Sequence, residues 1–224
     1  MKECLIVCNG HLTKKDLYKY TKLNKPRKVI DVIACDGASD FLKNAGVIPD
    51  VIIGDFDSVK PQTFKYFSKR KVLIKQVIDQ NKNDLEKAII FALSKKYKVI
   101  NITGLTGKRL DHTLNNISIL MKYHKKAKIW FYENGFEGMI VSKKAEFSCK
   151  IGDIVSLIPL PKASGVTASG LKYPLKNETL EMGVRTGALN EALKKNVNVS
   201  VKKGLLLVLA RTANIKFGFP PSRE

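Results

Sequence analysis

The chain has 224 residues, of which 44% are hydrophobic and 27% charged, so it can bury one large core or two modest ones and is neither disordered nor fibrous. No apolar run approaches the roughly 20 residues that a membrane span requires, and the start meets a glycine too soon for a signal peptide, so we expect a soluble, cytoplasmic protein with no membrane contact. The net charge of +20 comes from 34 Lys and six Arg against 20 acidic residues. Because Lys predominates and is spread along the chain, we interpret the charge as a solvated surface that attracts small anions, and we expect no nucleic-acid partner.

The first 133 residues alternate strand-like and helix-like segments. Short apolar runs predict strands, whereas apolar residues at helical spacing, such as Leu85, Ala88 and Ala92, predict helices. In chain order, we predict strands at 4–10, 29–35, 50–55, 72–78, 99–104 and 128–132, and helices at 13–23, 38–44, 61–68, 84–96 and 110–124. Repeated β-α units of this kind predict a mostly parallel sheet with helices on both faces.

From residue 134 onward the pattern changes to strands alone. The segments 145–160, 165–171 and 197–210 are strand-like and are separated by Gly, Pro and Asn turns. This pattern is typical of an antiparallel sandwich. The expected fold class is therefore α/β plus all-β, with a mostly parallel α/β domain at 1–133 and a β-sandwich domain at 134–224.

Aspartates follow each predicted strand end from the second to the fifth. They are Asp36, Asp55, Asp57, Asp79, Asp84 and Asp111. Because the carboxyl ends of parallel strands meet at one edge of a sheet, we expect these side chains to converge there. Gathered carboxylates repel each other unless a cation lies among them, and their hard oxygen atoms suit Mg²⁺. In extended backbone, Asp55 and Asp57 would point the same way, roughly 7 Å apart, and could hold one ion or two.

The loop GLTGKRLDH at 104–112 is the second chemical signal. Gly104 and Gly107 allow the backbone to approach a phosphate closely, and Lys108 and Arg109 supply positive charge. The loop is not a Walker A motif, because its spacing is too short and Arg109 stands where Ser or Thr should follow the Lys. Together with the aspartates, it suits a nucleoside triphosphate with Mg²⁺, whose transfer depends on positioning and charge neutralisation.

These motifs resemble the successive signatures of thiamine pyrophosphokinases. The stretches concerned are DGASDFL, NAG and IPDVIIGDFDS between residues 36 and 58, DQNKNDLEKAI at 79–89 and GLTGKRLDHTLNNI at 104–117, with SLIPL, SGLKYPL and GALNE resembling that family's second domain. The resemblance covers roughly residues 30–210. It implies an α/β nucleotide domain followed by a β-sandwich, assembled as a homodimer. It also implies transfer of the diphosphate of ATP to the hydroxyl of thiamine, with release of AMP.

The resemblance further implies residue roles. Asp55, Asp57 and Asp84 would hold Mg²⁺. The catalytic set would be Asp55, Asp57, Asp84, Arg109 and Asp111. The residues that bind ATP would be Asp36, Gln80, Gly104, Thr106, Lys108 and His112. Tyr173, Leu189 and Asn190, from the second domain, would enclose thiamine across the dimer interface.

Two departures from the family pattern concern the acceptor. Several relatives have Trp where Tyr173 stands, and Tyr stacks more weakly on a flat cationic ring. The family commonly has Ser before the Asn, but here the residue is Leu189, which removes a hydroxyl near the acceptor. Another small alcohol, such as a hydroxymethylpterin, is therefore an alternative acceptor. An alternative of a different class, a nucleic-acid-binding module, predicts salt-sensitive binding that survives loss of the aspartates, but the chain lacks an Arg- and aromatic-rich patch.

Overall fold

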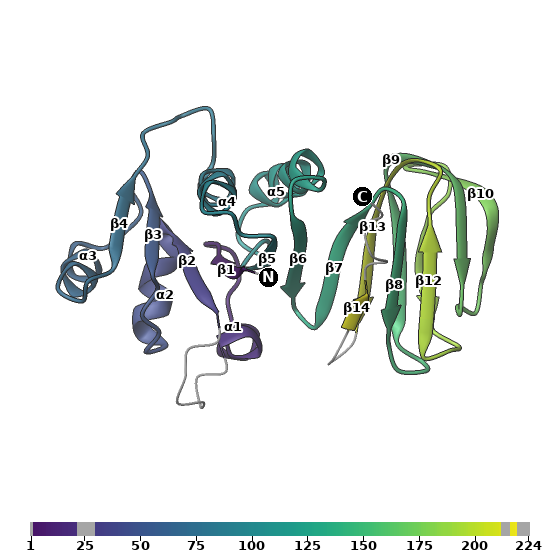
Figure 1. The fold of residues 1–224 in the computed structure, drawn as a ribbon, viewed down its shortest axis with the longest axis horizontal. Helices are drawn as coiled ribbons and strands as arrows, with labels where there is room; N and C mark the ends of the chain where they lie inside the picture. Colours follow the sequence, from purple (N-terminus) through teal and green to yellow (C-terminus); the bar gives the residue numbers. More distant parts are fainter. Residues whose placement is uncertain (1, 22–29, 212–215, 219–224) are drawn as a thin grey trace. The chain divides into compact units, whose positions relative to one another are not determined.

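The chain divides into two compact units, Met1–Asn134 and Gly135–Glu224, in a computed structural model that describes residues 2–21, 30–211 and 216–218 (Figure 1). In this described part of the chain, no helix is both long and apolar enough to cross a membrane. The change from α/β units to strands alone, predicted from the sequence, is the main feature of the architecture.

The first unit contains a parallel sheet with helices between its strands. Its strands are β1 (Glu3–Val7), β2 (Asp31–Cys35), β3 (Val51–Gly54), β4 (Leu73–Gln76), β5 (Val99–Thr103) and β6 (Lys128–Glu133). Its helices are α1 (Lys14–Thr21), the short 3-10 helix η1 (Asp36–Ala38), α2 (Ser39–Asn44), α3 (Pro61–Ser68), α4 (Asp84–Ser94) and α5 (Leu110–Tyr123). The strand order is β6-β5-β1-β2-β3-β4, and each of these neighbouring pairs is parallel.

Helices cover both faces of this sheet. Figure 1 shows α4 and α5 on one side and α1 and α2 on the other. On the second side, Leu5 and Val7 of β1 pack in one buried cluster with Leu17 of α1, Leu42 of α2 and Phe67 of α3. This alternation along β1 follows from the two-residue period of a strand. The prediction of a mostly parallel sheet with helices on both faces is confirmed.

The predicted helices agree with the structure except at their ends. The helix at 61–68 is confirmed in full, and the Thr13 hydroxyl caps α1 by accepting the Asp16 N–H at 3.1 Å. The helix predicted to end at residue 96 ends at Ser94, because Lys96 adopts a left-handed backbone with φ +61°. The predicted end of the first helix, at residue 23, and the predicted start of the second strand, at residue 29, lie outside the described residues.

The second unit consists of antiparallel strands. They are β7 (Phe136–Val141), β8 (Lys144–Ser148), β9 (Ile154–Ser169), β10 (Leu175–Glu181), β11 (Gly187–Glu191), β12 (Asn196–Ser200), β13 (Lys203–Arg211) and β14 (Lys216–Gly218). Strand β9 connects the other strands of this unit. It pairs with β11 near its start, with β13 from Val155 to Ser164, and with β10 and β12 towards its end. The strand-rich second half that the sequence predicted is confirmed.

Strand β9 corrects the predicted break between residues 160 and 165. The sequence placed 145–160 and 165–171 in separate segments, but β9 continues through Pro159 and Pro161. On one side of β9, pairing with β11 reaches Leu157 and pairing with β10 begins at Lys162. The prolines thus lie where one partner strand replaces another, a position that tolerates a missing N–H.

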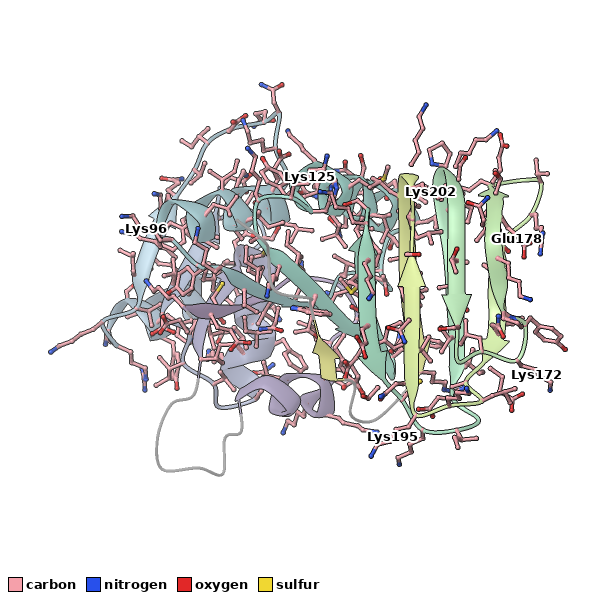
Figure 2. The ribbon with its side chains drawn as sticks, turned by 45° about the vertical axis from the view of Figure 1, so that its right-hand side comes forward. Lys96, Lys125, Lys172, Glu178, Lys195 and Lys202 are labelled. Carbon is pink, nitrogen blue, oxygen red and sulfur yellow. The ribbon has the colours of Figure 1, made fainter. Side chains whose placement is uncertain are left out.

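The lysine excess is distributed over both units. Lys96 and Lys125 of the first unit are exposed, as are Lys172, Lys195 and Lys202 of the second (Figure 2). Long charged side chains of this kind remain solvated and contribute to the field around the whole protein. Their placement agrees with the interpretation of the charge as a general surface property.

Candidate active site

A cavity of about 420 Å³ opens at the carboxyl edge of the parallel sheet in the first unit. The loops after five successive strands line it. Examples are Asn9 after β1, Asp36 after β2, Asp55 after β3, Asp84 after β4 and Thr106 after β5. Strand β1 lies between β2 and β5, so the chain reverses its direction of progress across the sheet at this point. In α/β sheets, ligands bind outside the carboxyl ends of the strands at such a switch point.

Three carboxylates meet in this cavity. Asp36, Asp55 and Asp84 each offer an oxygen atom, and these atoms all lie within 4.8 Å of one another. Asp36 is only 1% exposed, and its carboxylate accepts hydrogen bonds from the backbone N–H groups of Gly37 and, at 3.0 Å, of Phe56. A side chain at Gly54 would lie 2.7 Å from the Asp36 side chain, so the glycine that ends β3 leaves room for this carboxylate.

The environment of these carboxylates favours a cation. Burial, together with the nearby charges of Asp84 and Asp55, raises the pKa of Asp36 to about 7. For Asp55, partial burial opposes ionisation, but a hydrogen bond from Lys87 outweighs it and lowers the pKa. A divalent cation among the three would relieve their repulsion, and carboxylate oxygens are the ligands that Mg²⁺ prefers. The donor set therefore fits Mg²⁺.

Asp57 lies beside this cluster, since its N–H donates to Asp55 Oδ1 at 3.5 Å, but it is not one of the three grouped carboxylates. Phe56 has a left-handed backbone with φ +70°, so the expectation of extended backbone between Asp55 and Asp57 is wrong. Asp57 is exposed, lines the cavity and accepts a hydrogen bond from the Ser58 hydroxyl at 2.8 Å. The role of Asp57 as a metal ligand stays a prediction. Asp36, which the predicted set of metal ligands did not include, belongs to the cluster.

The start of α4 places Asp84 at the cavity. Asn83 caps the helix by accepting the Glu86 N–H at 3.0 Å, and Asp84 occupies the first turn, where the helix dipole favours negative charge. The Asn83 amide donates to Asn116 Oδ1 at 2.9 Å, and the Asn116 amide donates to the Leu105 carbonyl at 2.8 Å. This chain of bonds joins the start of α4 to the loop after β5. Sequence reasoning missed both asparagines.

Lys87 is the most important residue that sequence reasoning missed. It is 4% exposed, and its Nζ lies 3.1 Å from Asp55 Oδ2 and 3.0 Å from Asp84 Oδ1. Burial disfavours the ammonium charge, but the hydrogen bonds to Asp84 and Asp55 outweigh it and raise the pKa of Lys87. The spacing contained a signal, because residues three apart share one face of a helix.

Basic residues of the loop after β5 line the same cavity. The predicted residues that line it from this loop and the start of α5 are Gly104, Thr106, Lys108, Arg109 and His112, and Gln80 lines it from the segment before α4. Asp111 lies outside the lining and forms an exposed ion pair with Arg109, which lowers the pKa of Asp111 to about 2. A catalytic role for Asp111 stays a prediction.

The glycines of this loop allow two loops to pack together. The Gly10 N–H donates to the Gly104 carbonyl at 2.8 Å, and the His11 N–H donates to the Thr106 carbonyl at 2.6 Å. A Cβ at Gly104 would lie 2.3 Å from the Cys8 carbonyl oxygen, and the residue has φ +72°. The structure thus gives Gly104 a packing role that the sequence interpretation, approach to a phosphate, had not considered.

Glu133 supports the loop from inside the first unit. Its carboxylate accepts the Leu105 N–H at 2.8 Å and is 6% exposed. Burial raises the pKa of Glu133 to about 7, and the charge of Asp16 acts in the same direction. The loop after β5 is therefore held by a hydrogen bond to a buried acid whose ionisation is costly.

The predicted thiamine residues lie in the second unit. Asn190 is 4% exposed, and its amide is engaged with the backbone of Tyr173: Oδ1 accepts the N–H at 3.0 Å and Nδ2 donates to the carbonyl at 2.8 Å. The side chains of Tyr173 and Leu189 are 63% and 77% exposed. Two of the three residues thus offer side-chain surface, whereas Asn190 holds the segment that carries Tyr173.

The fold and the cavity together define a class. A parallel α/β sheet whose carboxyl edge combines clustered carboxylates with basic residues is typical of enzymes that act on phosphorylated small molecules with a divalent cation.

Comparisons with known proteins define the family. The model of the "Thiamin pyrophosphokinase, catalytic domain" matches residues 22–131, and that of the "Thiamin pyrophosphokinase, vitamin B1 binding domain" matches residues 140–206. The thiamine pyrophosphokinase of Bacillus subtilis (strain 168) is 30% identical over 188 residues, which are 80% of this chain and 86% of that protein. Thiamin pyrophosphokinase 1 of Caenorhabditis elegans is 25% identical over 194 residues, 78% of this chain and 76% of that protein.

A solved structure agrees with these matches. The crystal structure of the Bacillus subtilis thiamine pyrophosphokinase superposes with a TM-score of 0.82 at 29% identity, covering 95% of this chain and 100% of that one. The chain belongs to the thiamin pyrophosphokinase family.

Proposed function

We propose that this protein transfers the terminal diphosphate of ATP to the hydroxyl of thiamine, giving thiamine diphosphate and AMP. In this reaction the hydroxyl oxygen bonds to the β-phosphorus, the bond from that phosphorus to the α,β-bridging oxygen breaks, and the hydroxyl proton passes to solvent. The observation that carries the proposal is the match of both family domains, in order, to a chain whose first unit has carboxylates and basic residues in one cavity.

Mg²⁺ would be held by Asp36, Asp55 and Asp84, whose oxygens lie close enough to share one ion. Asp57, on the exposed side of the same cavity, would contact the ion or the phosphates. When bound, the ion would neutralise charge on the phosphates. No nucleophilic side chain is required, because the acceptor hydroxyl attacks directly and the protein positions the reactants.

ATP would lie against the loop after β5. Lys108 and Arg109 would offset phosphate charge, and Gln80, Thr106 and His112 would contact the nucleotide from the cavity wall. Gly104 would act by keeping this loop packed against the loop after β1.

Thiamine would be contacted by Tyr173 and Leu189, whose side chains are exposed, with Asn190 holding the Tyr173 segment in place. A hydroxymethylpterin is less favoured as acceptor, because the matched relatives are named for thiamine. A homodimer and a cytoplasmic location stay predictions.

The test is AMP release by the purified chain with ATP and Mg²⁺, measured in parallel with thiamine and with hydroxymethylpterin. We expect AMP formation that depends on thiamine and on Mg²⁺ and that is stoichiometric with thiamine diphosphate. If AMP is released only with the pterin, the acceptor is the pterin and not thiamine. If no AMP is released with either alcohol, the proposed reaction is refuted. ADP in place of AMP would show transfer of a single phosphoryl group and refute the diphosphate step.

A further inference from the structure

Lys87 places a protein cation inside the acidic cluster. Its ammonium bridges Asp55 and Asp84 at 3.1 and 3.0 Å, and its side chain is 3% exposed, whereas those of Asp55 and Asp84 are 35% and 30% exposed. The lysine is therefore much more buried than the two carboxylates, although all three residues line the cavity. The two carboxylates come from different segments: Asp55 from the loop after β3 and Asp84 from the first turn of α4.

A buried ammonium is costly unless it is paired, so its position requires an explanation. Without Lys87, Asp36, Asp55 and Asp84 would lie within 4.8 Å of one another, and among the described residues no other ion pair offsets their charges. Lys87 supplies that charge from the same helix face as Asp84 and from a buried position. A surface ion pair would have neither the burial nor the two partners.

We propose that Lys87 is a resident cation that holds Asp55 and Asp84 in position when no divalent cation is bound. The inference rests on the proposed Mg²⁺ site and adds a positioning residue to it. The ammonium fixes the separation of the two carboxylates in the metal-free protein, so that Mg²⁺ would meet ligands already in place. Lys87 and Mg²⁺ then act on the same carboxylates, and the loss of one makes the protein depend more strongly on the other.

The test measures the midpoint of thermal unfolding, Tm, of the full-length Lys87→Met variant in EDTA and in saturating Mg²⁺, without nucleotide. Met conserves the length and the apolar stem while it removes the charge. We expect a Tm about 5 °C below that of the unsubstituted protein in EDTA, because the carboxylates repel each other. We expect Mg²⁺ to restore at least half of this loss, since the ion replaces the missing charge.

Lys122→Met is the matched control. Lys122 also pairs with an acid of α4, Glu86, at 2.6 Å, but neither residue lines the cavity. Its change in Tm should be the same in EDTA and in Mg²⁺. If Lys87→Met lowers Tm equally in the two media, the lysine is only structural and the inference is overturned.

Two further outcomes are decisive. If Mg²⁺ alters Tm in none of the three proteins, the proposed metal site fails, which is distinguishable from failure of the lysine inference alone. If Lys87→Met does not fold in EDTA, refolding is attempted in Mg²⁺ with this variant and with Lys87→Gln, which keeps a hydrogen-bond donor. Recovery with Mg²⁺ supports the inference, and failure of both variants in both media overturns it.

Discussion

Asn190→Ala separates two roles that one residue can have. The sequence placed Asn190 among the thiamine contacts, but in the structure both ends of its amide bind the Tyr173 backbone, and Oδ1 also accepts the Glu191 N–H at 2.9 Å. The substitution removes these three bonds and leaves the Tyr173 groups without their side-chain partner. At about 1 kcal/mol for each bond, unfolding should become easier by about 2–3 kcal/mol.

The assay is urea unfolding of the full chain, with Asn196→Ala as control. Asn196 accepts one exposed hydrogen bond, from the Ser148 hydroxyl at 3.1 Å, so its loss should cost less than about 0.5 kcal/mol. If Asn190→Ala is no more destabilising than this control, the hydrogen bonds to Tyr173 contribute little and the positioning role is refuted.

A double-mutant cycle tests how Asn190 affects the KM for thiamine. Tyr173→Ala should raise the KM for thiamine with little loss of stability, because the side chain is 63% exposed. If Asn190 acts through Tyr173, the double variant should have a KM no higher than the worse single variant. Multiplied effects on KM would instead indicate that Asn190 contacts thiamine directly, as the sequence predicted.

Three other predictions concern the first unit. Asp57→Asn should lower turnover at least about 100-fold, because it removes a negative charge from the cavity, and should leave Tm unchanged, because Asp57 is exposed. Unchanged turnover would show that Asp57 has no role in the reaction. Gly104→Ala should destabilise by about 2–3 kcal/mol in urea unfolding, through the Cys8 clash, whereas Gly46→Ala, with similar φ and open space, should cost about 1 kcal/mol. The pKa of Glu133 is raised to about 7 in the folded state, so between pH 4.5 and 7 the folded protein holds a proton that the unfolded chain has lost. The free energy of unfolding should therefore fall as pH rises from about 4.5 to 7, by on the order of 3 kcal/mol relative to Glu133→Gln. Parallel pH profiles of the two proteins would refute this.

The sequence was sufficient for features that depend on period and topology. Strands follow one another in parallel, so the aspartates after β2, β3 and β4 had to reach the same edge, and Asp36, Asp55 and Asp84 do so. The helices at 61–68 and 110–123 follow from local spacing and from Pro61 in a first turn.

The sequence was insufficient where contacts between distant residues decide. The left-handed backbone at Phe56 coincides with its N–H donating to Asp36, 20 residues away, and a dipeptide pattern contains no sign of this. The bonds from Asn190 to Tyr173 span 17 residues between a strand and a loop. Lys87 is a different case, because Asp84 lies three residues before it on the same helix and this spacing predicts the ion pair.

The division of these residues between the two units bears on the acceptor. The residues that line the cavity belong to the first unit, among them the carboxylates and the basic residues suited to ATP. The departures from the family pattern, Tyr173 and Leu189, are exposed side chains of the second unit. If these side chains contact the acceptor as proposed, a change at these positions would alter that contact without altering the groups that would hold the phosphates. We therefore expect substitutions there to change KM for thiamine more than turnover, and substitutions at Asp55 or Asp84 to do the reverse.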